Sequence, residues 1–326
     1  MRAVLVRKLF FSTLILLILF SVLAIGCSGG IEQVTGTSSD ALDALLVPDT
    51  DLELYVYAKQ ERSTSIPAEI INLSHDIKVD SLAIWGLPSE EDLVFGAGLT
   101  FASSSDASEI YSAIVSEENS WKILRDNKIY IVRGSGTSAE SLKSAILNNN
   151  FKYYTDRNVL ETVSMLPNGG RTKMIAITVV KPSQQVLDFA EDYIGDEDFE
   201  QITGILKLLN PDVMIGGLYS PHQINVAKAV EAFENGVGVS TLDVGVLVLV
   251  KSTLPGFVVS PVAKGLLVDH GFTEVKFSEF SVYKWLWTAP DNSKISVLAR
   301  VEDNRIFAAV SGQEAYAETL ITSVYK

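Results

Sequence analysis

A short segment that occurs twice in the chain constrains the fold more than any other feature. Asp126-Asn127-Lys128-Ile129-Tyr130 recurs as Asp303-Asn304-Arg305-Ile306-Phe307. In both places a β-type run precedes the Asp-Asn pair and another follows it. Asp and Asn tolerate the positive φ that tight hairpin turns require, so each copy predicts a strand, a short turn and a second strand. Each copy then reaches a glycine, Gly134 or Gly312, and enters a helix.

The segments upstream extend this similarity. Strands are expected at 92–101 and 243–251, each followed by a helix, and earlier strands at 52–58 and 173–180 also lead into helices. Both halves therefore approximate the order β-α-β-β-α-β-β-α. Helices that alternate with hairpins favour the α+β class, with mainly antiparallel sheets and the helices packed on one face. Chance similarity between two ordinary hairpins is the alternative.

The turn signal Pro167-Asn168-Gly169-Gly170 divides the two modules, which we place at residues 47–166 and 167–326. The second module is expected to hold an extra helix near 225–234 and one long strand from 274 to 288. Residues 27–46 contain several glycines, serines and threonines and few aromatics. That composition predicts a flexible tether.

The first 26 residues have the three zones of a secretory signal: the basic Arg2, Arg7 and Lys8, an apolar run at 9–25, and a small residue before Cys27. The segment Leu23-Ala24-Ile25-Gly26-Cys27 resembles the lipobox of bacterial lipoproteins, although its leucine stands four residues before the cysteine and not three. The resemblance implies cleavage before Cys27 by lipoprotein signal peptidase, acylation of that cysteine, and an extracytoplasmic body anchored to the membrane by lipid. An uncleaved membrane-spanning anchor is the alternative.

The charge of the chain bears on its partners. The full sequence has 26 basic and 40 acidic residues, and removal of residues 1–26 leaves 23 basic residues and a net charge of −17. A surface this acidic repels phosphate backbones, so nucleic acid is not an expected partner. Cys27 is the only cysteine, which excludes a disulfide or a thiolate metal site within one chain.

Two sequence motifs suggest chemistry that their context does not support. Gly134 to Ala139 spells G-x-G-x-x-A, but the strand before it belongs to a hairpin and not to a parallel βαβ unit, so a turn and helix cap is expected and no cofactor is predicted. Ser281 and Lys284 have the S-x-x-K spacing of a serine nucleophile and its lysine base. They lie in a run that alternates like a strand, where an odd offset sends them to opposite faces.

Metal ligation has little support. The three histidines, His75, His222 and His270, lie far apart and have no ligand partners at metal-site spacing. The acidic run 191–200 offers a weak calcium candidate in Asp196, Asp198 and Glu200, but its order is not that of an EF-hand loop. A solvated link between two helices is the expected role of this run.

An aromatic stripe is the best candidate for a binding surface. Tyr283, Trp285 and Trp287 alternate along the predicted strand and therefore share one face. Such rings could form a platform for sugars or for an apolar partner, or they could be a layer packed under a helix. Because both faces of this strand are apolar, packing in the core is the favoured interpretation.

These patterns predict an exported, lipid-anchored envelope protein of a non-enzymatic binding or assembly type, with no catalytic residues. Its partner would be another envelope protein or an extracellular ligand. One alternative is an exported hydrolase whose acids, Asp196, Asp198 and Glu200 among them, come together only in three dimensions. Another is a solute-binding lipoprotein of a transporter, a class that usually has parallel βα units.

Overall fold

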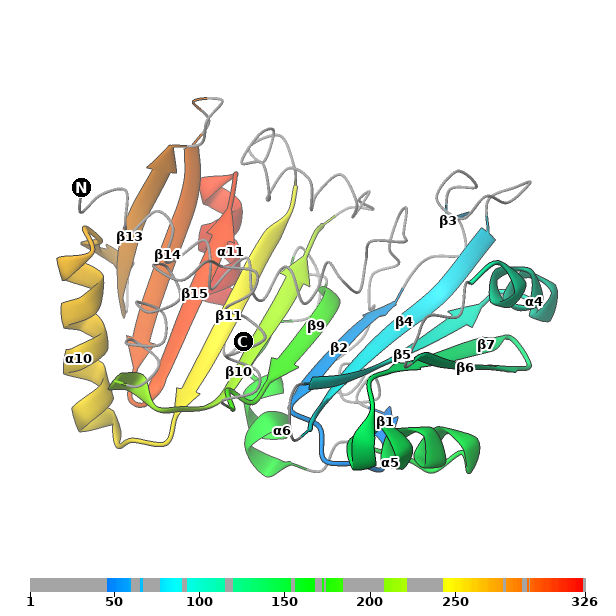
Figure 1. Cartoon of the computed structure of the whole chain (residues 1–326). Helices are drawn as coiled ribbons and strands as arrows, with labels where there is room; N and C mark the ends of the chain where they lie inside the picture. Colours follow the sequence, from blue (N-terminus) through cyan, green and yellow to red (C-terminus); the bar gives the residue numbers. More distant parts are fainter. Residues whose placement is uncertain are drawn as a thin grey trace.

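The structure is a computed structural model that describes residues 46–324 apart from 60–64, 67–76, 90–92, 115–119, 154–155, 168–171, 173, 184–207, 222–242, 278–279, 289–291 and 293 (Figure 1). The elements of the first half are β1 (Leu46–Pro48), β2 (Leu54–Lys59), β3 (Ser65–Ile66), β4 (Ile77–Pro88), β5 (Leu93–Phe101), α4 (Ser104–Ala113), β6 (Ser120–Arg125), β7 (Lys128–Arg133), α5 (Gly136–Leu147) and β8 (Phe151–Tyr153). Helix α6 (Arg157–Val163) leads into the second half. That half contains β9 (Met174–Val180), β10 (Pro211–Tyr219), β11 (Gly245–Ser252), α10 (Gly256–Asp269), β12 (Thr273–Phe277), β13 (Phe280–Thr288), β14 (Lys294–Glu302), β15 (Arg305–Ser311) and α11 (Glu314–Ser323).

One long sheet runs through both halves of the described chain. Its strand order is β12-β13-β14-β15-β11-β10-β9-β2-β4-β5-β7-β6, with β3 paired to β4. Every neighbouring pair is antiparallel, and β1 and β8 form a separate antiparallel pair. The predicted α+β class with mainly antiparallel sheets is therefore confirmed.

The two halves follow the same strand order. Three strands come first (β2, β4 and β5, or β9, β10 and β11), then a helix, then the hairpin β6–β7 or β14–β15, then a second helix. In each half the second strand of the hairpin pairs with the third strand of the half. The second half adds the hairpin β12–β13 outside β14. Whether this shared order reflects a duplication stays a prediction.

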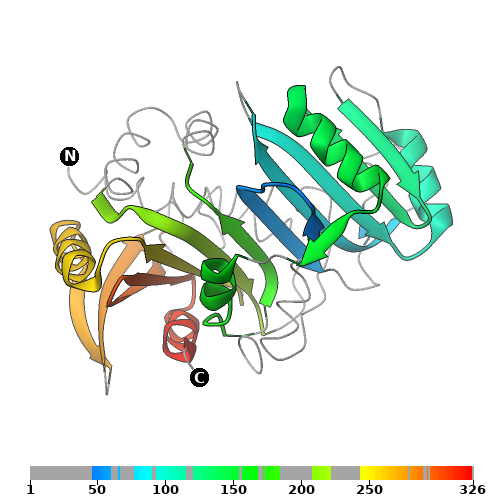
Figure 2. The same cartoon turned by 90° about the horizontal axis from the view of Figure 1, so that it is seen from below.

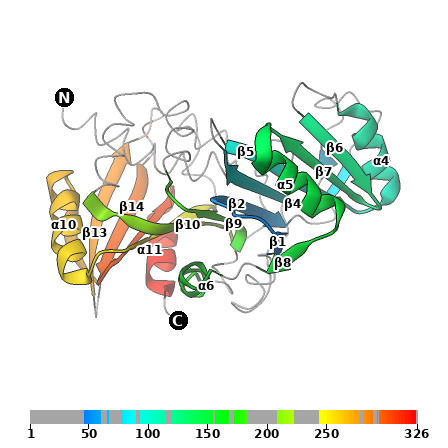
Figure 3. The same ribbon diagram turned by 60° about the horizontal axis from the view of Figure 1, so that its bottom comes forward.

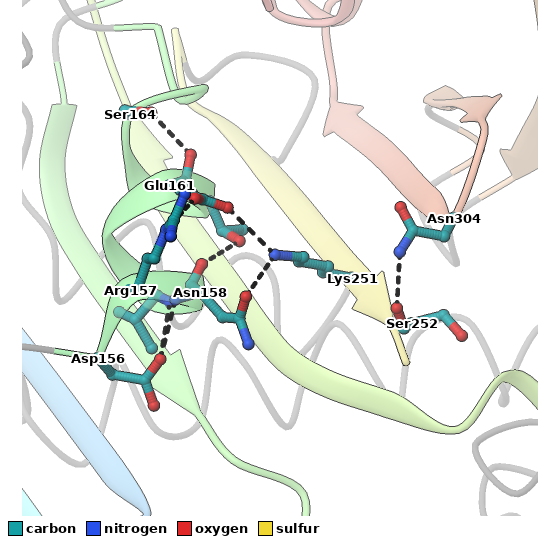
Figure 4. A network of polar contacts seen from close by, with 10 residues as sticks. Asp156, Arg157, Asn158, Glu161, Ser164, Lys251, Ser252 and Asn304 are labelled. Carbon is teal, nitrogen blue, oxygen red and sulfur yellow. Dashed lines mark hydrogen bonds and ion pairs between the residues drawn. The ribbon is translucent and has the colours of Figure 1, made fainter. Parts of the chain in front are cut away.

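The repeated Asp-Asn pair makes the same turn in both hairpins. Asp126 and Asp303 have φ values of 52° and 54°, in the left-handed region. The side-chain amide of Asn127 donates to the carbonyl of Phe101 at 2.6 Å, and that of Asn304 donates to the carbonyl of Ser252 at 2.8 Å (Figure 4). Phe101 ends β5 and Ser252 ends β11, so each turn ties its hairpin to the end of the neighbouring strand.

The helices lie on both faces of the sheet, which corrects the prediction that they pack on one face. Tyr130 and Val132 of β7 share a core cluster with Leu142 of α5. Ile129 of the same strand belongs to a second cluster with Ile110 of α4. Since successive strand residues point to opposite faces, α4 and α5 cover opposite sides of the sheet.

The second half repeats this arrangement, with α11 on the cluster of Phe307 and α10 on the cluster of Ile306. Figures 2 and 3 show α5 across one face of the first half, and α10 and α4 toward opposite ends of the sheet. The physical reason for the two-sided cover is that strands such as β7 carry apolar residues on both faces, which only a layer on each side can bury.

One predicted strand differs from the structure, and three predicted helices lie outside the described residues. The long strand predicted at 274–288 is wrong, because β12 and β13 are two antiparallel strands in which Phe277 lies opposite Phe280 and their rings stack with centroids 6.3 Å apart. The helices predicted after the strands at 52–58 and 173–180 fall on residues 60–64, 67–76 and 184–207, outside the described residues, and so does the helix predicted at 225–234.

The halves join edge to edge through their first strands. Leu54–Ala58 of β2 pair with Ala176–Val180 of β9, and every residue of β9 is buried. One core cluster contains Trp85 and Leu142 of the first half and Leu298 and Leu320 of the second. The body is therefore continuous across the junction.

Candidate docking surface

Helix α10 is placed on the sheet by the turn that follows β14. A Cβ on Gly256 would stand 1.8 Å from Oδ1 and 2.7 Å from the backbone carbonyl carbon of Asp303, so only glycine lets the first turn of the helix approach the hairpin this closely. Val259 and Ala263 are the buried residues of α10, and they pack with Val301 of β14. These contacts stabilise α10, whose four valines, Gly265 and Pro261 give it a low intrinsic helix propensity.

The outward face of α10 is apolar. Phe257 is 81% exposed, Val268 56% and Val258 37%, and Pro261 is also exposed. At helical spacing these exposed residues lie on the side of α10 that faces away from the buried Val259 and Ala263. We call Phe257, Val258, Pro261 and Val268 the α10 patch. The charged residues of α10 are Lys264, on the same outward side, and Asp269 in its last turn.

Helix α4 provides an internal comparison, because it has the same place in the first half. It follows the third strand of its half and buries two residues, Ala107 and Ile110, against the same face of the sheet. Its exposed residues are all serines: Ser104, Ser105, Ser108 and Ser112. The fold therefore accepts a polar helix at this position, and the apolar outer face of α10 is not a requirement of packing.

The predicted aromatic stripe lies on the strand beside α10. Tyr283 is 6% exposed, and its burial, followed by the nearby carboxylate of Glu274, raises the pKa of its hydroxyl. The ring of Trp285 tilts against that of Phe272, just beyond α10, with centroids 5.8 Å apart, and Trp287 is half-buried. This packing favours a layer beside the helix over an open platform, and a ligand-binding role for the stripe stays a prediction.

The other residues considered from the sequence do not assemble a reactive site in the described chain. Ser281 and Lys284 lie on a strand at an odd offset, and Lys284 forms an ion pair with Glu314. Gly134 and Gly136 have φ values of +125° and +82° between an antiparallel strand and α5, which is the predicted turn at a helix start.

The structure does not describe the residues that the sequence suggested for calcium binding and for lipidation. Asp196, Asp198, Glu200 and Cys27 lie outside the described residues. Among the residues that are described, no group of three His, Cys, Asp or Glu side chains could hold a metal ion. No helix of the described part is long and apolar enough to cross a membrane.

A polar groove lies beside α5. It has a volume of about 790 Å³ and is lined by Asp49, Gly136, Thr137, Glu140, Ser141, Ser144, Ala145, Asn148 and Asn150. The hydrogen bond from Lys152 lowers the pKa of Asp49. The lining offers hydroxyl, amide and carboxylate groups, and no histidine or lysine is among these nine residues.

A polar network fixes α6, the link between the halves, to the second half (Figure 4). Asp156 caps the helix by accepting from the backbone N–H groups of Asn158 and Val159, and it pairs with Lys181 at 2.7 Å. The ammonium of Lys251, at the end of β11, donates to the side-chain carbonyl of Asn158 at 2.7 Å. These contacts tie α6 to strands of the second half.

The carboxylates of this network have lowered pKa values. Burial alone would raise the pKa of Asp156, but the hydrogen bond from Lys181 and the backbone N–H groups together bring it below its ordinary value. At Glu161 the hydrogen bond from Arg157 is the main cause of a lowered pKa.

Comparisons with known proteins add no identity. No protein-family model and no curated protein matches the chain. Among solved structures, crystal form I of TP0453 is 12% identical with a TM-score of 0.35, covering 87% of this chain and 99% of that chain. Crystal form III of TP0453 is 11% identical with a TM-score of 0.37, covering 85% and 96%. At these scores the likeness supports no conclusion about fold or function.

The α10 patch is the surface that sequence reasoning missed. The sequence predicted a helix after the strand at 243–251 and no binding surface on it, and the structure leaves Phe257 and Val268 of this helix exposed. The signal was present, because apolar residues recur on both sides of α10, and one neighbouring sheet can cover only one side of a helix.

Proposed function

We propose that the protein is a non-enzymatic, lipid-anchored envelope protein whose folded body docks on the bilayer surface through the α10 patch. The single observation that carries this proposal is the exposed apolar face of α10, with Phe257 81% exposed, in a position where α4 exposes serines. Exposed apolar surface of this kind marks a contact site.

The predicted anchor explains why the partner would be a membrane. A diacylglyceryl group on Cys27 contributes about 0.8 kcal/mol for each methylene buried, so two chains hold a protein stably. A flexible tether over residues 28–46 would have a root-mean-square span of about 25 Å. The body would therefore stay near the lipid surface, at an effective concentration in the millimolar range.

The size of the patch fits a contact that works together with the anchor. Covering the exposed parts of Phe257, Val258 and Val268 would contribute at least about 3 kcal/mol, if full burial of one such side chain contributes about 1.5–3 kcal/mol and is scaled by the exposed fraction. That is too little to bind a free protein tightly. For a body already tethered, the same energy multiplies the docked-to-undocked ratio by roughly a hundredfold over that of a body without the patch.

The chemistry of α10 suits the headgroup region better than the hydrocarbon interior. Pro261 has no N–H, so the carbonyl of Phe257 lacks its usual helical partner and needs a donor from water or a headgroup. Lys264 is the one cation on the outward side, and the chain as a whole is acidic. Docking should therefore depend on apolar contact and little on lipid charge.

An environment-sensitive fluorophore tests the docking directly. Acylation would block Cys27, so a cysteine introduced by Lys264→Cys, on the outward side of α10, can be labelled alone with nitrobenzoxadiazole in the full lipidated chain while all four residues of the patch are kept. On phosphatidylcholine vesicles we expect a blue shift and an intensity rise for this label. The matched control is Ser108→Cys on α4, whose label should keep the emission it has in water.

The two parts of the proposal fail separately. A chain that floats with vesicles while the Lys264→Cys label stays in water would retain the anchor and refute docking through α10. For the anchor, the mass of the mature native protein should show loss of residues 1–26 and acyl chains on Cys27. An intact Met1 with a free Cys27 thiol would refute lipidation.

A further inference from the structure

The edges of the sheet differ in how they are covered. Each half has two edge strands, its first strand and the first strand of its hairpin. The first strands, β2 and β9, pair with each other, and β14 is extended by β13. Strand β6, which has the place of β14 in the first half, has no strand on its outer side among the described residues. Three of the four edges thus continue into an antiparallel strand and one does not.

Strand β6 lacks the outward charges that usually protect an edge. All six of its side chains are half-buried, including its two cations. The ammonium of Lys122 donates to the carbonyls of Tyr111 at 2.8 Å and Ile114 at 2.6 Å, at the end of α4. The guanidinium of Arg125 donates to the carbonyl of Leu147 at 2.8 Å, at the end of α5. Both charges are therefore turned onto helix ends over the two faces and do not guard the edge.

The opposite end of the same sheet shows the usual protection. The side chains of Glu274 and Lys276 on the edge strand there, β12, are exposed. Exposed charges on an edge strand discourage pairing with another chain. The contrast between β12 and β6 lies within one sheet, so it reflects a difference between these two edges and not a property of the fold.

We propose that β6 is a self-association edge, at which β6 of one chain pairs antiparallel with β6 of a second copy. Residues opposite each other in such a pair must share a face, so a twofold axis passes through a residue and not between two. With the axis at Ile123, Trp121 lies opposite Arg125 of the second copy, and Lys122 lies opposite Leu124. With the axis at Lys122, two lysines would face each other, which is destabilising.

The strand fits its own copy because this register is self-complementary. It places a cation beside an aromatic ring on each side of the axis and leaves no like charges opposite each other. Leu147, which is 49% exposed and holds Arg125 through its carbonyl, would lie toward the Trp121 ring of the second copy. A twofold pairing also closes on itself, so it produces a dimer and not a fibre.

Disulfide trapping tests the register. In the full chain with Cys27→Ser, Ile123→Cys adds one cysteine on the predicted axis, where opposed Cα atoms of an antiparallel pair are about 4.5–5.5 Å apart and can form a disulfide. Mild oxidation should give a species at twice the 35.5 kDa mass of one chain. The matched control is Val275→Cys on β12, which should stay monomeric. Equal cross-linking of both variants, or none at Ile123→Cys, would overturn the proposal.

Sedimentation velocity in detergent tests the association itself. The chain should be dimeric between about 1 and 100 μM. Ile123→Glu places like charges opposite each other and should weaken self-association at least about tenfold, whereas Val275→Glu on β12 should not. Circular dichroism checks that both variants fold. A chain that is monomeric over this range, or a dimer unaffected by Ile123→Glu, would exclude pairing through β6.

Discussion

Replacing Phe257 by serine should separate docking from stability. The side chain is 81% exposed, so its loss removes little packing in the folded state, and the free energy of unfolding should change by less than about 0.5 kcal/mol. Covering a phenylalanine fully contributes about 1.5–3 kcal/mol. Four-fifths of that range is about 2 kcal/mol, so Phe257→Ser should reduce the docked-to-undocked ratio about thirtyfold.

The assay follows the patch from a second position on α10. A nitrobenzoxadiazole label on Val268→Cys should report docking of the lipidated chain on phosphatidylcholine vesicles, with and without Phe257→Ser. The matched control is Leu286→Ser, since Leu286 is an exposed leucine, at 40%, on β13 and outside the patch. The reasoning is refuted if Phe257→Ser leaves the label's emission on vesicles unchanged. A fall in Tm of more than about 4 °C would also refute it, because the side chain would then be packed in the fold.

Three further predictions concern the frame that holds these surfaces. Gly256→Ala should destabilise the fold by about 1–3 kcal/mol, because the new Cβ would collide with Asp303, and thermal unfolding measures this. Asn127→Ala and Asn304→Ala should each cost about 1 kcal/mol in chemical denaturation, and a large inequality would contradict an equivalent role for the two turns. The lowered pKa of Asp156 means that its ion pair stabilises the fold above about pH 4 and is lost as the pH falls through the folded-state pKa. Asp156→Asn keeps a helix cap but loses the charge, so its Tm should fall less than the wild-type Tm between pH 5 and pH 3; an unchanged pH dependence would mean that other groups dominate.

The hairpins could be predicted because a local signal determines them. Asp126 and Asp303 stand where the turn needs positive φ, and the apolar runs beside them alternate as strands do. Turn residues did not reveal the hairpin of β12 and β13, because the run Val275–Thr288 contains no glycine or proline to mark the turn between Phe277 and Phe280. A turn without such residues is visible only through the pairing of the strands on either side.

The placement of the helices could not be predicted from periodicity alone. Each helix has one apolar stripe, and the stripe does not say which side of the sheet it covers. The strands contain part of this information. Strand β7 has four consecutive apolar residues, Ile129, Tyr130, Ile131 and Val132, and a strand that is apolar on both faces needs a layer on each side of the sheet. The α10 patch could not be predicted for a related reason: apolar residues on a helix do not show which of them a neighbouring layer covers.

A comparison of the two halves shows which features both halves share and which features only one half has. Both halves share two features. An asparagine in the turn of the hairpin donates to the carbonyl at the end of the neighbouring strand, and two buried residues pack the helix (α4 or α10) against the sheet. Where they differ, packing gives no reason for the difference, as at the exposed faces of α4 and α10 and the outer edges of β6 and β14. These two differences lie toward opposite ends of the sheet (Figure 1), so α10 can contact a bilayer while β6 contacts a second copy. A variant at one surface should therefore leave the other unaffected, and Ile123→Glu should weaken pairing without changing the emission of a label at position 264.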